Sequence, residues 1–374
     1  STSIYRSNAT IFWWINSKKM QRYSRQIILP NFGNEAQNLL AKSKVLVVGA
    51  GGLGVPVLQY LAAAGVGKLG IADGDIVEIS NLQRQVLYTE AEVGRNKAQV
   101  AKEKITKLNS TIELEVYDFF IDQYSVFDLI EQYDIVVDCT DQFSIRYLLN
   151  DVCFLLKKPL VFASIYQFEA QLSVFHYGEK PYNLRDVFSE IPNEKAVPNC
   201  NEAGVLGTLA GIAGNFQANE VIKIITKIGV VNSGKLLLFN SLNNQIAQLS
   251  ITKNEEIFLP TSKEEILQNN YGFFCADEFT VENIEILEQI LNNKNTALVD
   301  VREKNELPKI TTFPVLEIPL SDLPENMALL QQFDALVFIC KSGIRSKKAV
   351  LLLQEKGYAK PCYSVQKGVE IFKK

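Results

Sequence analysis

Short apolar runs alternate with helical stretches through the first part of the chain. The runs are rich in Val, Ile and Leu, as in strands buried on both faces, and they lie at Lys44–Ala50, Lys68–Asp73, Ile112–Val116, Asp134–Thr140 and Leu160–Ala163. Helical periodicity predicts helices from Pro56 to Gly65 and over 95–108, 125–132 and 144–157. This alternation predicts an α/β fold, a Rossmann-like domain whose mostly parallel sheet has helices on both sides.

The pattern changes after Ser164. Residues 168–177, 235–241 and 244–252 indicate antiparallel strands that extend the sheet, and a long helix with regularly spaced glycines is expected over about 203–227. A second alternating unit, with strands at 297–301, 335–340 and 361–365 and a helix at 346–356, indicates a second, small α/β domain. The expected organisation is an extension (1–19), a first domain (20–252), a linker (253–278) and a second domain (279–374).

Composition excludes several classes of protein. The chain is 47% hydrophobic and 21% charged with a net charge of −4, so it folds and has no basic excess for nucleic acid. The apolar run at 11–15 is too short to span a membrane, so no membrane association is expected. Six cysteines without a CxxC pair favour free thiols in the cytoplasm over disulfides. The single histidine, His176, excludes a His-rich metal site and is expected to be a bystander.

A glycine-rich loop follows the first strand and opens a helix. Gly49, Gly51, Gly52 and Gly54 form a GxGGxG pattern, which places backbone N–H groups and a helix N-terminus against a phosphate. Asp73 ends the next strand, where it can accept hydrogen bonds from ribose hydroxyls. This pattern alone is also compatible with NAD binding, or with a tight turn that binds no ligand.

Charged residues behind the loop favour a nucleoside triphosphate. Attack at an α-phosphorus requires cations along the phosphates and a carboxylate for magnesium, and Arg84, Lys97 and Asp141 are residues of those types. A single Arg or Lys is more often a solvated surface charge. Because Arg84, Lys97 and Asp141 all follow the loop in order, we interpret them as contacts for phosphates and magnesium and not as surface charges.

Six motifs give residues 20–252 a specific resemblance. They are RYSRQIILP (22–30), VLVVGAGGLG (45–54), AAGVGKLGIADGD (63–75), SNLQRQ (80–85), VGRNKA (93–98) and DCTDQF (138–143). They resemble the MoeB/ThiF-type activating enzymes for ubiquitin-like sulfur carriers. The resemblance implies ATP-dependent adenylation of the C-terminal glycine of a ThiS/MoaD-like carrier protein, with Mg²⁺ as cofactor and a homodimer as the assembly.

The resemblance also assigns roles to individual residues. Gly52 would contact the phosphates and Asp73 the ribose, Arg84 and Lys97 would neutralise the phosphates, and Asp141 would hold magnesium. Arg25 would reach ATP across the dimer interface. The remaining residues expected to bind the nucleotide are Gly49, Gly51, Gly54, Asp75, Ser80, Asn81, Gln83 and Gln142.

The chain departs from the family pattern in one respect. Many members carry two CxxC pairs that bind a structural zinc, the first near positions 181–186 here and the second after Ile251. Neither region has a cysteine pair, so no zinc is expected.

Two cysteines are candidates for sulfur chemistry. Cys200 matches the family position that forms a thioester or acyl disulfide with the carrier, although it is also compatible with a bystander thiol. Cys340 ends an apolar strand and opens a loop of Lys341, Ser342, Gly343, Ile344 and Arg345 before a helix, where amides and the helix N-terminus stabilise a thiolate or persulfide. This loop and the segment LVDVR (298–302) resemble rhodanese-type sulfurtransferases; a buried core cysteine is the alternative.

The sequence therefore predicts an adenylyltransferase fused to a rhodanese-like domain that takes sulfur from a donor such as a cysteine desulfurase. An NAD-dependent oxidoreductase and a non-catalytic adaptor for a ubiquitin-like protein are the alternatives. The residues do not indicate whether the sulfur goes to thiamine, molybdopterin, cysteine or tRNA.

Overall fold

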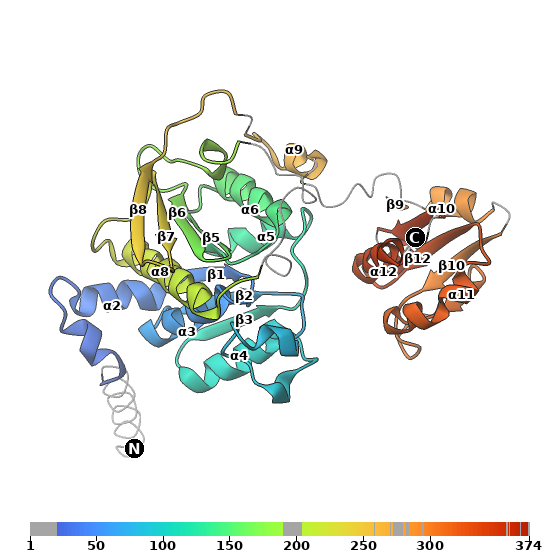
Figure 1. The fold of residues 1–374 in the computed structure, drawn as a ribbon, viewed down its shortest axis with the longest axis horizontal. Helices are drawn as coiled ribbons and strands as arrows, with labels where there is room; N and C mark the ends of the chain where they lie inside the picture. Colours follow the sequence, from blue (N-terminus) through green and yellow to red (C-terminus); the bar gives the residue numbers. More distant parts are fainter. Residues whose placement is uncertain are drawn as a thin grey trace, which may run out of the picture. The chain divides into compact units, whose positions relative to one another are not determined.

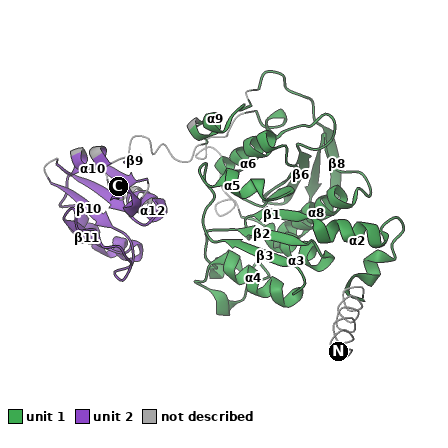
Figure 2. Cartoon of the chain, turned by 180° about the vertical axis from the view of Figure 1, so that it is seen from behind, with its two compact units in different colours: residues 1–272 green, residues 273–374 purple. Residues whose placement is uncertain are grey.

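The chain folds into two compact units, residues 1–272 and 273–374 (Figure 2). The computed structural model describes residues 21–189, 204–257, 259–269, 271, 280–281, 284–292, 295–356, 358, 360–366 and 368–372. Both units contain a sheet with helices, and the predicted α/β class is confirmed (Figure 1).

The first unit is built on an eight-stranded sheet of order β3-β2-β1-β4-β5-β6-β7-β8. Its strands are β1 (Lys44–Val48), β2 (Lys68–Ala72), β3 (Glu113–Tyr117), β4 (Ile135–Asp138), β5 (Leu160–Tyr166), β6 (Glu169–Phe175), β7 (Lys235–Asn240) and β8 (Gln245–Ser250). Strands β1 to β5 pair in parallel, and β5 to β8 pair antiparallel. The predicted parallel sheet with an antiparallel extension is therefore present.

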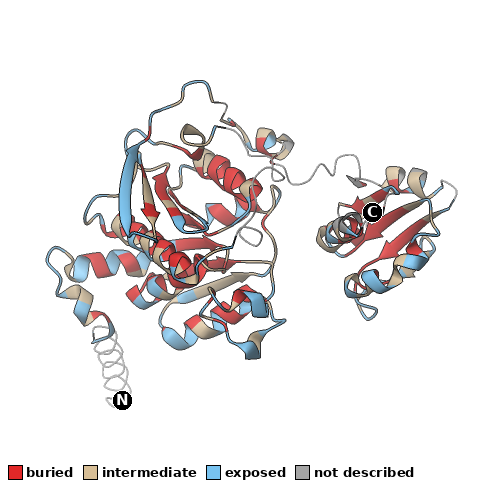
Figure 3. Ribbon diagram, in the orientation of Figure 1, coloured by how far each residue is buried: buried red, intermediate tan, exposed pale blue. Residues whose placement is uncertain are grey.

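Helices cover both faces of this sheet. They are α2 (Gly33–Lys42), α3 (Gly54–Ala64), α4 (Lys97–Leu108), α5 (Val126–Glu131), α6 (Phe143–Leu156), α8 (Gly207–Thr226) and α9 (Lys263–Gln268). Helix α8 packs against α2, α3 and the sheet, whereas α6 packs against α5, α9 and the sheet. The central strands are apolar because helices bury them from both sides (Figure 3).

The order of strands places the candidate site. Strand β1 lies between β2 and β4, so the chain crosses to opposite sides of β1. Residues that follow β1, β2 and β4 meet at one edge of the sheet, where α/β proteins bind their ligands. The glycine loop, Asp73 and Asp141 follow these three strands.

Two of the glycines of helix α8 allow close packing. A Cβ atom on Gly214 would lie 2.4 Å from the carbonyl oxygen of Leu53, and one on Gly207 would lie 2.2 Å from that of Gln83. Gly211 has nothing within 4 Å of its added Cβ. The regularly spaced glycines expected on this helix therefore form a packing surface only in part. The helix begins at Gly207, after the expected residue 203.

Part of the predicted linker packs on the first unit. The side-chain amide of Gln123 donates to the carbonyl of Leu267 (3.1 Å), and the buried Tyr271 hydroxyl donates to Oδ2 of Asp151 (2.9 Å). Helix α9 is too short and too charged for periodicity to reveal it. The expected domain boundaries remain predictions.

The second unit contains a parallel sheet of order β11-β10-β12-β13-β9. Its elements are β9 (Thr280–Val281), α10 (Ile284–Leu291), β10 (Thr296–Asp300), β11 (Val315–Glu317), α11 (Met327–Leu330), β12 (Ala335–Ile339), α12 (Ile344–Glu355) and β13 (Cys362–Val365). Separate apolar clusters cover its two faces. Across the described parts of both units, no helix is long and apolar enough to cross a bilayer.

Candidate active site

The glycine loop is formed where the backbone at Gly49, Gly54 and Cys139 lies too close together for side chains on the glycines. Gly49 has a φ of +96°, and a Cβ atom there would lie 2.6 Å from the carbonyl oxygen of Cys139. A Cβ atom on Gly54 would lie 1.8 Å from the carbonyl oxygen of Gly49. Gly51 is less confined, with the Gln85 side chain 3.4 Å from its added Cβ. The loop thus exposes backbone that a phosphate group can approach.

Asp73 ties this loop to strand β2. One carboxylate oxygen accepts the N–H of Ala50 and the other that of Asp75, both at 2.8 Å. Burial raises the pKa of the Asp73 carboxyl, and the two N–H groups and the Lys97 charge oppose this rise. The Tyr88 hydroxyl donates to the carbonyl of Ala50 (2.7 Å), so the loop is fixed from a third direction.

The VGRNKA motif supplies the buried cation. The Lys97 side chain is only 7% exposed, and its Nζ lies 2.7 Å from Oδ2 of Asp75. Asn96 donates to the carbonyls of Asp73 (3.1 Å) and Asp75 (3.2 Å) and caps helix α4 by accepting the N–H of Gln99. The structure therefore brings Asp73, Asp75 and Lys97 together, as expected of one site.

The SNLQRQ motif forms a turn that places a second cation at the loop. Nη1 of Arg84 donates to the carbonyl of Ser80 (2.9 Å), and Cγ of Arg84 would lie 3.6 Å from a Cβ on Gly52. Asn81 is buried and accepts the N–H of Glu78 (3.3 Å), and Gln83 is exposed. Arg84 lies beside Gly52 because this turn is closed by its own polar groups.

Asp141 and Gln142 are exposed after strand β4, before helix α6. The loop reaches the glycines through Thr140, whose N would be 3.4 Å from a Cβ on Gly49. A single exposed carboxylate fits magnesium that is held mainly by phosphates and water. The described residues contain no group of three or more His, Cys, Asp or Glu side chains placed for a metal.

Two expected catalytic residues are not part of this assembly. Arg25 is exposed on the helical residues 21–27. Cys200 lies outside the described residues.

The Cys340 loop is a separate thiol site in the second unit. Its buried Sγ accepts the N–H of Gly343 at 3.1 Å and lies 3.6 Å from Oγ of Ser346. Gly343 has a φ of +90°, and a Cβ there would lie 2.1 Å from the carbonyl oxygen of Gln366. Ser364 donates to Ser346 (2.9 Å), which fixes the loop against strand β13. An N–H aimed at sulfur stabilises an anionic thiolate or persulfide.

An arginine–glutamate pair closes the same loop. Arg345 forms a bidentate ion pair with Glu306, with Nη2 to Oε2 at 2.8 Å, and this pair lowers the pKa of the Glu306 carboxyl to about 2. Lys341 and Ser342 are exposed, and Ile344 is partly buried. The residues of the Cys340 loop thus form one turn at the start of helix α12.

Sequence reasoning missed the residues that hold these loops in place. Tyr88, Asn96 and Glu306 act on backbone or on another side chain and carry no signal of their own. Asn96 lies inside the VGRNKA motif, so membership of that motif is the one signal that could have found it.

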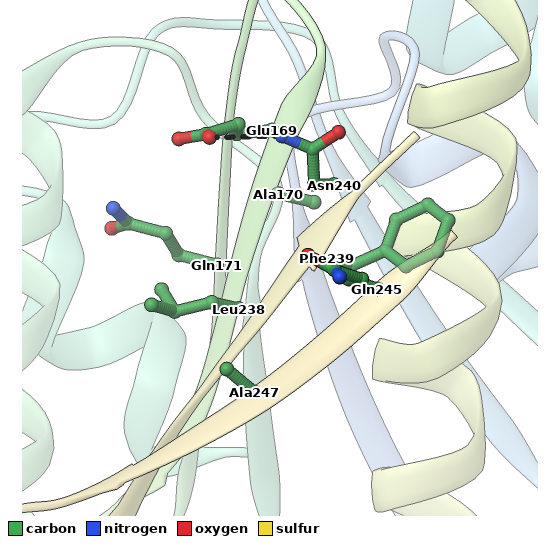
Figure 4. A pocket seen from close by; sticks show the side chains of 8 residues that line it. All are labelled: Glu169, Ala170, Gln171, Leu238, Phe239, Asn240, Gln245 and Ala247. Carbon is green, nitrogen blue, oxygen red and sulfur yellow. Dashed lines mark hydrogen bonds between the residues drawn. The ribbon is translucent and has the colours of Figure 1, made fainter. Parts of the chain in front are cut away.

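Figure 4 shows a pocket away from the glycine loop, on strands β6 to β8. It is lined by Glu169, Ala170, Gln171, Leu238, Phe239, Asn240, Gln245 and Ala247. The amide of Asn240 donates to Glu169 (3.1 Å). With no cation in its lining, this pocket is not suited to phosphates.

The two units define an α/β nucleotide-binding enzyme fused to a thiol-bearing parallel-sheet domain. Residues 23–258 match the ThiF family model, and residues 283–374 match that of the rhodanese-like domain. The chain belongs to the ThiF family and carries a C-terminal rhodanese-like domain, as its motifs predict.

Three relatives match the chain over more than two thirds of its length. A probable adenylyltransferase/sulfurtransferase MoeZ of Mycobacterium tuberculosis is 37% identical over 92% of this chain and 91% of its own length. Adenylyltransferase and sulfurtransferase MOCS3 of Sus scrofa is 37% identical over 91% of this chain and 82% of its own. A sulfur carrier protein adenylyltransferase of Thermus thermophilus is 44% identical over 69% of this chain and 97% of its own.

A solved structure resembles the first unit. The crystal structure of E. coli MccB with ATP superposes with a TM-score of 0.57 at 26% identity, covering 64% of this chain and 74% of that one.

The ion pair between Glu306 and Arg345 predicts a defined pH dependence. The pKa of Glu306 falls from an ordinary 4.5 to about 2 in the folded chain, so its stabilisation is complete above pH 4.5 and is lost as the pH falls toward 2. Denaturant unfolding should show wild type more stable than Glu306→Gln at pH 6, with the difference shrinking below pH 4.5. Glu317→Gln removes a more exposed ion pair and should change little at either pH. A difference for Glu306→Gln that stays constant down to pH 3 would contradict the assignment.

Proposed function

We propose that this protein adenylates the C-terminal glycine of a ubiquitin-like sulfur carrier and then delivers sulfur to it through Cys340. One observation carries the proposal: Asp73, Arg84 and Lys97 surround a glycine loop in a ThiF-family unit, and the same chain holds a thiol loop. The relatives named adenylyltransferase and sulfurtransferase support the same pair of activities. Neither an oxidoreductase nor an adaptor accounts for both sites.

Adenylation requires positioning and neutralisation of charge more than proton transfer. A carboxylate oxygen of the carrier attacks the α-phosphorus of ATP, the bond to the β-phosphate oxygen breaks, and pyrophosphate leaves. The carboxylate is already ionised at pH 7, so no general base is needed. Arg84 and Lys97 offset the charge on the phosphates, the glycine loop orients them, and Asp73 holds the ribose. Magnesium, held by Asp141, would neutralise charge on the leaving pyrophosphate.

Sulfur transfer uses the second unit. Cys340 takes a sulfane sulfur from a donor such as a cysteine desulfurase and becomes a persulfide. The terminal sulfur attacks the acyl carbon of the carrier adenylate, AMP leaves, and an acyl persulfide links carrier and Cys340. Cys200 or an external thiol attacks the sulfur of Cys340, which breaks the S–S bond and releases the thiocarboxylate. A thiol reductant then reduces the resulting disulfide and restores the free thiols.

Assembly and compartment complete the proposal. The exposed Arg25 would serve the ATP site of a second copy in a homodimer. A catalytic thiol that must stay reduced, and the free thiols of Cys139, Cys153, Cys340 and Cys362, fit the cytoplasm.

Loss of the phosphate contacts should abolish adenylation. Asp141→Ala and Arg84→Ala should each lower carrier-dependent exchange between ATP and pyrophosphate by ~10²–10³, because each removes charge stabilisation from the transition state. The substrate is a ubiquitin-like carrier ending in glycine, and Glu179→Ala, on an exposed loop, is the control. Exchange at the wild-type rate in both variants would refute the site.

Loss of Cys340 should separate the two half-reactions. Cys340→Ala should leave pyrophosphate exchange nearly intact and abolish sulfur transfer from thiosulfate or a desulfurase. Cys200→Ala should also spare exchange but slow release of the thiocarboxylate. Mass spectrometry of the carrier distinguishes the products. If Cys340→Ala still forms thiocarboxylate at the wild-type rate, Cys200 becomes the better candidate for sulfur acceptor.

We also infer that the fold requires no zinc. Asp186 joins the two segments in which the family resemblance would place cysteine pairs: its Oδ1 accepts the N–H of Asn254 (3.0 Å) and its Oδ2 lies 3.3 Å from Nζ of Lys253. Oδ2 also accepts the N–H of Asn183 (2.8 Å). We call these contacts of Asp186 with Asn183, Asn254 and Lys253 the Asp186 clip, which joins the two segments without a metal.

The Asp186 clip can be tested by metal analysis and stability. Elemental analysis should find no stoichiometric zinc, and a chelator should leave the melting temperature unchanged. Asp186→Ala should lower the melting temperature, since hydrogen bonds to a charged carboxylate contribute about 1.5–3 kcal/mol each. Glu255→Ala, with an exposed side chain nearby, should not. About one tightly bound zinc per chain would overturn the inference.

A further inference from the structure

The residue before Asp141 is held from two sides. Oδ1 of the buried Asp138 accepts the N–H of Thr140 at 2.9 Å and its hydroxyl at 2.7 Å. From the first turn of helix α6, Nη2 of Arg146 donates to the carbonyl oxygen of Thr140 at 2.6 Å. The donor, the hydroxyl and the acceptor of Thr140 are therefore all engaged, which fixes the peptide that leads into Asp141.

Arg146 is buried in a way that stability alone does not explain. Its side chain is 8% exposed, and its guanidinium lies 5.3 Å from the ring centroid of Phe162 and 5.9 Å from that of Phe143. Its Nε is 3.6 Å from Oδ2 of Asp138, and neither atom has a hydrogen-bond partner within the described residues. A buried ion pair with unmet hydrogen bonds contributes little net stability compared with apolar packing.

The same loop is connected to the phosphate-binding backbone. The carbonyl of Asp138 accepts the side-chain amide of Gln217 (2.7 Å), and that of Cys139 lies against Gly49. Any shift of Thr140 would therefore move Asp141 relative to the glycine loop.

We propose that Arg146 and Asp138 are positioning residues of the adenylation site, which fix Thr140 so that Asp141 meets the magnesium ion carried by ATP. The proposal rests on the proposed function, because it assigns magnesium to Asp141. Lysine cannot replace Arg146, since it lacks the planar group that lies over Phe162 while it donates to Thr140.

Calorimetric titration with the uncleavable analogue α,β-methylene ATP, with Mg²⁺ and then with EDTA, tests the proposal on the full chain. Mg²⁺ should raise the affinity for the analogue roughly tenfold less in Arg146→Lys than in the wild type, the effect typical of residues that orient a metal ligand. The affinity measured in EDTA should be the same in both proteins. Thr140→Val removes the hydroxyl bonded to Asp138 and leaves Arg146 in place, so it should show a smaller loss with less risk to folding.

Arg185→Lys is the matched control. Arg185 pairs with the buried Asp151 of the same helix α6, with Nη2 to Oδ2 at 2.7 Å, and lies 4.8 Å from the ring centroid of Tyr147. Replacing it changes another arginine that pairs with a buried carboxylate, further along helix α6 from Asp141. Its melting temperature should fall, and its Mg²⁺-dependent affinity should match that of the wild type.

The possible outcomes separate the two proposals. The positioning role would be overturned if Mg²⁺ raised the affinity of Arg146→Lys and Thr140→Val as much as that of the wild type. It would also be overturned if Arg185→Lys lost as much of this gain as Arg146→Lys. Wild-type protein that does not bind the analogue at all would instead overturn the proposed function, and with it the role of Arg146.

Discussion

The approach of three backbone segments at the edge of the first sheet determines the arrangement of the site. Gly49 lies against the carbonyl of Cys139, Gly54 against that of Gly49, and Gly214 against that of Leu53. Each contact excludes a side chain, so the end of β1, the end of β4 and helix α8 come together only because glycine occupies these positions. The loops that carry Asp73, Arg84 and Asp141 then take their places around this common point.

Much of the fold was predictable because its signals are local. Strands buried on both faces read as apolar runs, and the GxGGxG loop, SNLQRQ and VGRNKA lie in continuous sequence. Helix α9 was missed because it is short and charged, and because its contacts with the first unit, such as that of Gln123 with Leu267, are not visible in a local pattern. The ion pair of Glu306 with Arg345 joins residues far apart in sequence, and neither residue has a distinctive spacing. Periodicity predicts which face of a helix or strand is buried, but it does not predict which distant residue a side chain contacts.

Electrostatics differ between the two reactive sites. At the nucleotide loop, cations are held in place by carboxylates and carbonyls: Lys97 by Asp75, and Arg84 by Ser80. At Cys340, the group nearest to sulfur is a neutral backbone N–H, while the charge of Arg345 is matched by Glu306. Attack on the α-phosphorus of ATP with loss of pyrophosphate needs strong positive charge around the phosphates. Cys340 must accept a second sulfur atom and then release it. The dipole of the Gly343 N–H stabilises negative charge on sulfur less strongly than a cation would, so it still allows this release.

The Asp186 clip has a consequence for resistance to oxidation. A cysteine cluster loses its metal when its thiolates are oxidised or attacked by reactive sulfur, and the segments that it joins then separate. Carboxylate, amide and ammonium groups, such as those of Asp186, Asn254 and Lys253, do not undergo this chemistry. The join between these two segments can therefore remain intact under peroxide or polysulfide stress, so that oxidative loss of activity would begin at the catalytic thiols and not at this part of the fold.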